Sequence, residues 1–193
     1  MTKLLKLFFV FVFATGLSAC AWFEYSDNMT TLFDGANLQN WDQVGNADWS
    51  LNNGYVEGSG EAGFLVSERP YGDYRLIVEF WADGPANSGV FIRCDDDQTI
   101  GADNCYEVNI YDTRPDPTYR TGSIVNVAAP MAQIDAANQW NRFEILAQGS
   151  HLEVILNGVE TVNTDNDQLD AGYIALQYGS GVVRFREVRI QEL

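Results

Sequence analysis

The most regular alternation of apolar and polar side chains lies between residues 87 and 112. It predicts two β-strands, Gly89 to Cys94 and Cys105 to Asp112, because successive side chains of a strand point to opposite faces of the sheet. The apolar faces of these strands would bury Val90, Ile92, Cys94, Val108 and Ile110. The opposite faces would present Phe91, Arg93, Glu107, Asn109 and Tyr111. If the strands are neighbours, their polar side chains form one candidate binding surface.

Short alternating segments, separated by turn residues, continue from Met29 to the C-terminus, and no helical period runs beyond about two turns. Asn52-Asn53-Gly54 and Asn157-Gly158 are typical hairpin turns, because Asn and Gly readily take a positive φ. The other predicted strands are 49–51, 55–57, 63–67, 73–82, 122–127, 142–148, 151–156, 159–163, 172–177 and 182–191. This pattern predicts an all-β fold, a two-sheet jelly-roll sandwich in a single domain.

The first twenty residues have the order of an export signal. Lys3 and Lys6 precede an apolar run from Leu7 to Phe13 that is too short to span a bilayer. Leu17-Ser18-Ala19-Cys20 then matches the bacterial lipoprotein box, which predicts lipidation of Cys20; an ordinary signal peptide with a chance cysteine is the alternative. We therefore expect a signal peptide over 1–19, a lipidated tether over 20–29 and the folded domain over 30–193. The expected location is the outer membrane, facing the periplasm.

Acidic residues outnumber basic ones by 27 to 11, which gives a net charge of -16 at pH 7. A nucleic-acid partner is excluded by this balance, because phosphate binding needs a positive surface.

Two cysteines, Cys94 and Cys105, remain beside Cys20, and in an oxidising compartment such a pair favours a disulfide over a metal site. Between them lies an acidic run, Asp95 to Asp97 with Asp103. We expect this run to be solvated, because its spacing matches no known calcium loop. Binding of a divalent metal, calcium above all, is the alternative.

Familiar hydrolytic motifs are missing from the sequence. No Glu-x-Asp-x-Glu strand supplies the carboxylate pair of a retaining glycosidase. His151 is the only histidine and follows a Gly-Ser turn, so a Ser-His-Asp or Cys-His arrangement is not expected. No zinc-ligand motif is present either, and we assign no metal site.

An ordered series of short motifs resembles the bacterial 3-keto-disaccharide hydrolase domain family over about residues 30 to 193. The series comprises Leu32-Phe33-Asp34-Gly35, Trp41, Trp49, Asn87-Ser88-Gly89, Phe91, Arg93, Tyr106-Glu107-Val108, Asp112, Thr121-Gly122, Trp140-Asn141, Asn157-Gly158, Leu176-Gln177 and Phe185-Arg186. The resemblance implies a concanavalin A-like jelly roll whose concave sheet meets carbohydrate. It also implies cleavage of glycosides already oxidised to a ketone at C3, and an upstream sugar 3-dehydrogenase as a partner. Many relatives carry a His-Gly pair soon after this Leu-Gln, whereas this chain continues Tyr178-Gly179-Ser180-Gly181, so any step that depends on that histidine would be missing.

A C3 ketone acidifies the C2 proton, so a single general base can start elimination of the glycosidic oxygen. We expect Glu107 to be this base and Arg93 to stabilise the enolate. Asn87, Asn109 and Gln177 are expected to hold sugar hydroxyls, with Trp81 or Tyr111 stacking on the ring. The alternatives are a cross-strand ion pair of Arg93 with Glu107, a non-catalytic carbohydrate-binding lipoprotein and a structural envelope protein without a ligand.

Overall fold

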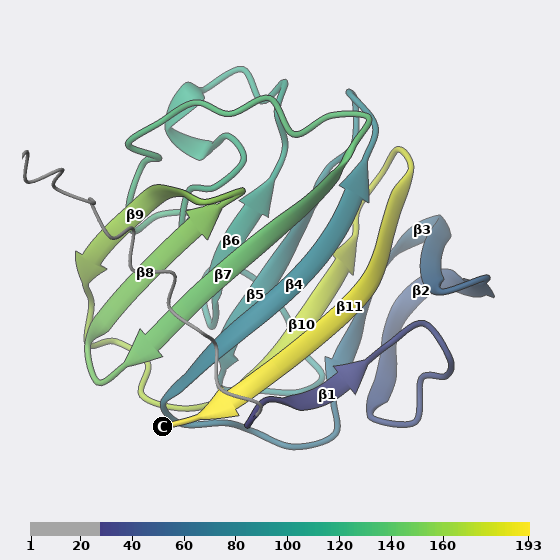
Figure 1. The fold of residues 1–193 in the computed structure, drawn as a ribbon, viewed down its shortest axis with the longest axis horizontal. Helices are drawn as coiled ribbons and strands as arrows, with labels where there is room; N and C mark the ends of the chain where they lie inside the picture. Colours follow the sequence, from purple (N-terminus) through teal and green to yellow (C-terminus); the bar gives the residue numbers. More distant parts are fainter. Residues whose placement is uncertain (1–27) are drawn as a thin grey trace, which may run out of the picture.

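The structure, a computed structural model, describes residues 28–193, which form eleven β-strands (Figure 1). The strands are β1 (Thr30–Phe33), β2 (Trp41–Asn52), β3 (Tyr55–Ser67), β4 (Tyr74–Ala82), β5 (Ser88–Cys94), β6 (Tyr106–Ile110), β7 (Trp140–Gln148), β8 (His151–Leu156), β9 (Val159–Asp165), β10 (Tyr173–Tyr178) and β11 (Val183–Glu192). The one helical element in this part of the chain is a 3-10 turn, Pro117–Tyr119, and no helix there has the length and apolarity needed to cross a membrane. The predicted signal peptide and the lipidation site at Cys20 lie outside the described residues.

All strand pairs are antiparallel and follow the order β6-β5-β10-β3-β11-β4-β7-β8-β9, with β1 on β11 and β2 on β3. The sheet curls through the long strand β3, whose last residues pair with β10 and whose first residues pair with β11. It therefore makes two layers, with β4, β7, β8 and β11 in front of β5, β6 and β10 in Figure 1. One apolar core joins Val90 and Ile110 of one layer to Leu76, Phe143 and Val154 of the other.

The two predicted hairpin turns are confirmed. Gly54 takes a φ of 84° between β2 and β3, and Asn157 and Gly158 take φ values of 52° and 81° between β8 and β9. Such positive φ values match the turn to the twist of the strands that it joins. The alternation that predicted β4 and β8 places Tyr74, Leu76, Val78 and Phe80 in the core, together with Leu152, Val154 and Leu156.

Two strand predictions are wrong. Residues 122–127 form no strand: Gly122 and Asn126 have φ values of 87° and 63°, and the segment makes only isolated bridges through Ile124. Residues 55–57 and 63–67, predicted as separate strands, are the two ends of β3. β3 continues without a break across its glycines. One of them, Gly58, packs against the Tyr178 side chain, and a Cβ atom at this position would come within 2.6 Å of it. Glycine in a strand often marks such a close approach.

Candidate functional site

The outer face of β6, β5, β10 and the end of β3 carries the predicted polar residues in aligned rows. Glu107 is paired with Phe91, and Phe91 with Ala175. One row further on, Gly89 lies opposite Asn109, and Gln177 lies opposite Phe64. Cross-strand partners and residues two apart share a face. We call this surface the Glu107 face, defined by Glu107, Asn87, Gln177, Phe64, Phe91 and Tyr111.

Glu107 is partly buried because it leans across the position of Gly89. A Cβ atom on Gly89 would lie 3.2 Å from Glu107 Cγ and 3.4 Å from Glu107 Oε1, so the glycine leaves the carboxyl group its space. Burial raises the pKa of Glu107 to about 7, and the charge of Arg114 opposes this rise. A carboxyl group that titrates near neutral pH is suited to act as a general base.

An apolar patch lies beside Glu107. The rings of Phe64 and Phe91 meet edge to face, with centroids 5.4 Å apart, and Phe91 also clusters with Val66 and Ala175. Gln177 stands next to this patch, and its Oε1 atom is buried yet accepts no hydrogen bond within residues 28–193. Since a buried unpaired acceptor costs free energy, a ligand hydroxyl is a suitable partner for Gln177.

Asn87 and Tyr111 lie at the end of the same face. The backbone of Asn87 is fixed by hydrogen bonds to Ser180 and Gly179. Its Nδ2 atom lies over Gly179, 3.1 Å from where a Cβ atom would be. Tyr111 is half-buried, and its backbone N–H donates to Thr121 Oγ1 over 2.9 Å. Both side chains therefore keep groups that could contact a bound molecule.

Asn109 is on this side of β6 but does not line the surface as predicted. It is fully buried, and its Nδ2 donates to the carbonyl oxygen of Tyr119. Its backbone N–H donates to Ser123, and its carbonyl accepts from Gly122. The segment 119–123 therefore covers Asn109, which fixes this segment instead of holding a sugar hydroxyl.

Sequence reasoning missed Arg114, the cation that acts on Glu107. Its guanidinium lies 5.8 Å from the ring centroid of Tyr111 and 5.3 Å from that of Tyr119. The loop is brought back over β6 by Asp112, which accepts from Thr121 Oγ1 and from the backbone N–H groups of Ala136 and Ala137. In the sequence, Arg114 is only an arginine in a proline-containing loop. Its position beside Glu107 depends on how this loop folds, so the sequence alone did not predict it.

The prediction that Arg93 shares a surface with Glu107 is wrong. Two residues of β5, Ile92 and Arg93, lie opposite the single residue between Tyr173 and Ala175, and Arg93 has a φ of 53°. Such a bulge shifts the alternation by one residue, so Arg93 turns inward and is fully buried. Cys94 accordingly joins Phe91 in the outer apolar cluster, against its predicted burial with Val90.

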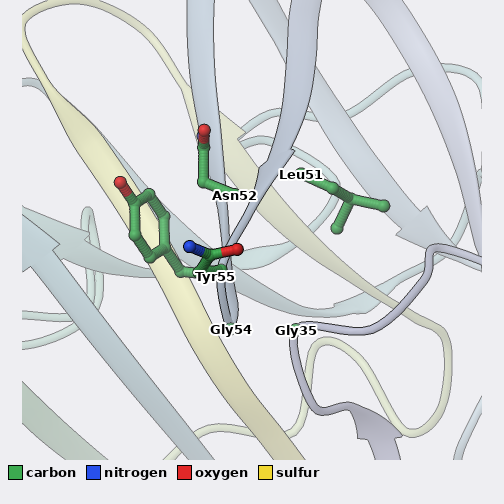
Figure 2. Close-up of a pocket in the computed structure, with 6 residues that line it drawn as sticks. Gly35, Leu51, Asn52, Gly54 and Tyr55 are labelled. Atoms are coloured by element: carbon green, nitrogen blue, oxygen red, sulfur yellow. The ribbon is translucent and has the colours of Figure 1, made fainter.

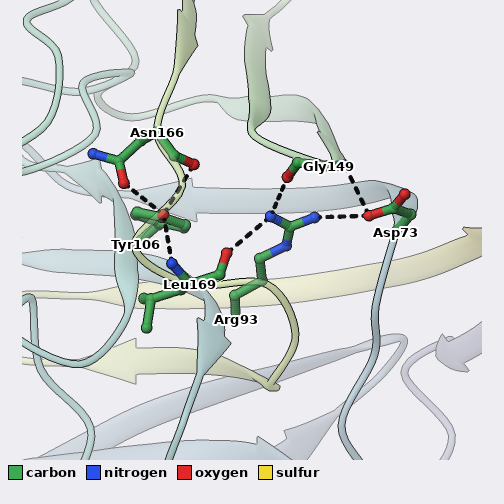
Figure 3. Close-up of polar contacts among 6 residues, drawn as sticks. All are labelled: Asp73, Arg93, Tyr106, Gly149, Asn166 and Leu169. Atoms are coloured by element: carbon green, nitrogen blue, oxygen red, sulfur yellow. Dashed lines mark hydrogen bonds and ion pairs between the residues drawn. The ribbon is translucent and has the colours of Figure 1, made fainter.

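Arg93 joins three loops through its guanidinium group (Figure 3). Its Nη1 donates to the carbonyl oxygens of Gly149 and Leu169, over 2.6 and 2.9 Å, and its Nη2 to Asp73 Oδ1 over 2.9 Å. Asp73 Oδ1 also accepts from the backbone N–H of Gly149. Arg93 is therefore a structural residue in this position, not a ligand for an enolate.

Trp81 also lies away from the Glu107 face. It belongs to β4, in the other layer, where it is paired with Arg184 and Trp140. The Arg184 guanidinium lies 4.7 Å from the centroid of one Trp81 ring and binds Glu57 over 2.5 Å. The predicted contact between Trp81 and the same sugar as Glu107 is therefore wrong.

The predicted disulfide between Cys94 and Cys105 is confirmed. It closes a short loop next to Glu107 and contributes on the order of 3 kcal/mol by the chain-entropy estimate. Asp96 within the loop accepts from the backbone N–H groups of Gln98 and Thr99. Across residues 28–193 no three His, Cys, Asp or Glu residues come together as metal ligands, so the acidic loop offers no cluster for calcium.

A hollow of about 690 Å³ lies at the β2–β3 turn, away from the Glu107 face (Figure 2). It is lined by Gly35, Leu51, Asn52, Asn53, Gly54 and Tyr55. Tyr55 is nine residues along β3 from Phe64, or roughly 30 Å along the strand. No carboxylate of residues 28–193 lines this hollow, so we place the candidate chemistry on the Glu107 face.

Comparisons with known proteins agree with this fold. A family model described as the 3-keto-alpha-glucoside-1,2-lyase-like domain matches residues 28–191. A comparison with curated proteins finds no match. A protein from Parabacteroides distasonis ATCC 8503, assigned as a candidate glycosyl hydrolase, has a similar structure: TM-score 0.71, 24% identity, and coverage of 86% of this chain and 99% of that one.

Two carbohydrate-related structures share the same architecture. The carbohydrate-binding module CBM66 from Bacillus subtilis matches with a TM-score of 0.61 and 16% identity, over 86% of this chain and 96% of the module. The exoplasmic/lumenal domain of VIP36, in a Ca²⁺-bound form, matches with a TM-score of 0.65 and 11% identity, over 87% and 93% of the two chains. At these identities the likeness establishes the fold, and the predicted jelly roll is confirmed.

Proposed function

The chain belongs to the family of 3-keto-alpha-glucoside-1,2-lyase-like domains, and on this premise we propose that it cleaves the glycosidic bond of 3-keto-glycosides on the Glu107 face. The observation that carries the proposal is the partly buried Glu107 carboxyl group, whose pKa is raised to about 7. A base with this pKa is largely ionised just above neutral pH and still basic enough to accept a carbon-bound proton.

In the proposed reaction, the Glu107 carboxylate takes the proton from C2 of the 3-keto sugar. The electron pair of the C2–H bond forms the C2=C3 bond of an enolate. When the enolate collapses to the ketone, a C1=C2 bond forms and the C1–O bond to the leaving group breaks. The leaving oxygen takes up a proton, and water then adds to the unsaturated ketone to complete hydrolysis. A single carboxylate suffices, so the sequence need not contain a glycosidase carboxylate pair.

Arg114 takes the role first expected of Arg93. Its charge already lowers the pKa of Glu107, so it lies close enough to act on an enolate that forms beside that carboxylate. Gln177 and Asn87 would hold sugar hydroxyls, and Tyr111 would stack on the ring. The apolar patch of Phe64 and Phe91 would keep water away from the reacting carbon.

A non-catalytic sugar-binding role is the second candidate. It is favoured by the likeness to a carbohydrate-binding module and by the lack of any histidine after Leu176-Gln177, where many relatives carry a His-Gly pair. Under either candidate we propose that the protein is lipid-anchored through Cys20 to the outer membrane and faces the periplasm. For the enzyme, a sugar 3-dehydrogenase would supply the ketone.

The test is release of free sugar from a defined 3-keto-disaccharide by the purified protein, with and without added Ca²⁺. We expect turnover by the wild type and a loss of about 10² to 10⁴-fold in kcat for Glu107→Gln, with substrate affinity retained. Glu68→Gln, a change at an exposed glutamate, serves as the matched control. If the folded wild type releases no sugar but binds the disaccharide, the sugar-binding role replaces the enzyme; if it does neither, both candidates fail.

A further inference from the structure

A second pocket, of about 270 Å³, lies between three segments that are far apart in the sequence. Its lining consists of Ala102, Asp103, Cys105, Tyr106, Asn126, Val127, Gln168 and Leu169. Tyr106 points into the core, whereas Glu107, the next residue of β6, points to the outer face. The pocket is therefore separate from the Glu107 face.

The walls of this pocket are held in place by specific interactions. The disulfide from Cys105 to Cys94 fixes the wall that carries Asp103. On the opposite wall, the backbone N–H of Leu169 donates to Tyr106 Oη over 3.0 Å, while its carbonyl oxygen accepts from Arg93 (Figure 3). Tyr106 Oη in turn donates to Asn166 Oδ1 over 2.7 Å. The pocket thus has a preformed shape, which lowers the entropy cost of binding a small molecule.

Three exposed polar residues, Asp103, Asn126 and Gln168, line the pocket. Within residues 28–193 their side chains make no hydrogen bond or ion pair, so their polar groups are available to a bound molecule. Asn126 takes a φ of 63° within the turn closed by the bridge between Ile124 and Ala128. Carboxylate and amide groups together can accept from and donate to adjacent hydroxyls, while Val127 and Leu169 offer apolar surface to C–H groups.

We propose that this pocket binds one neutral hexopyranose, as a sugar site independent of the Glu107 face. Its volume falls just below the roughly 300–1,000 Å³ of pockets for drug-sized ligands, so it suits a single ring. Asp103 and the net charge of -16 disfavour uronic acids and phosphorylated sugars. The pocket holds a single carboxylate side chain, Asp103, and therefore lacks the ligands of a metal site.

The experiment is a titration of the full-length, ¹⁵N-labelled protein with glucose, galactose, mannose and glucuronate, followed by amide chemical shifts. We expect at least one neutral hexose to cause saturating shifts at residues 102–106, 126–127 and 168–169, and glucuronate to bind more weakly. Asn126→Gly and Gln168→Ala should each weaken binding roughly fivefold, the effect of one lost hydrogen bond. Glycine suits the backbone of Asn126, so this variant should fold.

Asn138→Gly is the matched control, because Asn138 is also exposed with a φ of 61° but lies outside the pocket. Its hexose affinity should equal that of the wild type. The proposal is overturned if no hexose shifts the amide resonances of the pocket, or if glucuronate binds best. It is also overturned if the double variant Asn126→Gly/Gln168→Ala binds the hexose as well as the control does. Because the readout is binding, it stands whether or not the protein turns over a 3-keto-disaccharide.

Discussion

Replacing Glu107 by glutamine should change the pH dependence of stability in a defined direction. Burial raises the pKa of this carboxyl group from 4.5 to about 7, so the folded protein holds the proton more tightly than the unfolded chain. The resulting stabilisation is complete below pH 4.5 and is lost as the pH rises through 7. Glutamine is neutral throughout and has the same shape, so Glu107→Gln avoids this loss.

The size of the effect follows from the two pKa values. At about 1.4 kcal/mol per pKa unit, the wild type loses up to about 3 kcal/mol relative to the variant between pH 4 and pH 8. Urea unfolding of the two proteins at intervals of pH measures this difference directly. The difference in the free energy of unfolding between Glu107→Gln and the wild type should grow mainly between pH 4.5 and 7. The control Glu68→Gln should show the same pH dependence as the wild type.

The same pKa governs the proposed reaction, in which Glu107 must be ionised. The kcat/KM of the wild type should rise tenfold per pH unit below about 7 and level off above that value. The reasoning is refuted if wild type and Glu107→Gln change stability in parallel across this range. It is also refuted if the rate profile levels off near pH 4.5, because the carboxyl group would then be solvated.

Two arginines that were assigned different roles give contrasting predictions. Arg93→Leu should lower the free energy of unfolding by about 3 kcal/mol in urea, because the carbonyl groups of Gly149 and Leu169 and the Asp73 carboxylate lose their shared donor. The exposed control Arg75→Leu should stay within about 0.5 kcal/mol of the wild type, and an equal effect of both changes would contradict the structural role of Arg93. Arg114→Gln should lower kcat about a hundredfold and move the rise of the rate profile to higher pH, since Arg114 lowers the pKa of Glu107. Arg114→Lys should keep part of the rate that Arg114→Gln loses. If the pH–rate profile of Arg114→Gln does not shift, Arg114 does not act on Glu107.

The alternation of side chains predicted the fold well because most strands pair without interruption. In β5, Val90 and Ile92 enter the core and Phe91 faces outward, as expected. The prediction fails at Arg93 because the bulge depends on the pairing with β10, between Tyr173 and Ala175. The sequence of β5 alone contains no sign of it.

The candidate site was predicted in part for the same reason. Glu107 and Gln177 lie on regular, paired strands, so their shared face follows from alternation and register. Asn109 obeys the alternation but is covered by a loop, and Arg114 reaches the site through that loop. Positions that depend on loop conformation have no periodic signal in the sequence.

The nine-strand path through the sheet has two ends, and each is guarded against pairing with another molecule. At β6, segment 121–125 occupies the free backbone groups: Ser123 and Gly122 bond to Asn109, and Val125 bonds to Glu107. At β9, the exposed side chains include Glu160 and Asp165, which repel an identical strand. Copies crowded together on a surface should therefore resist aggregation through β6 and β9.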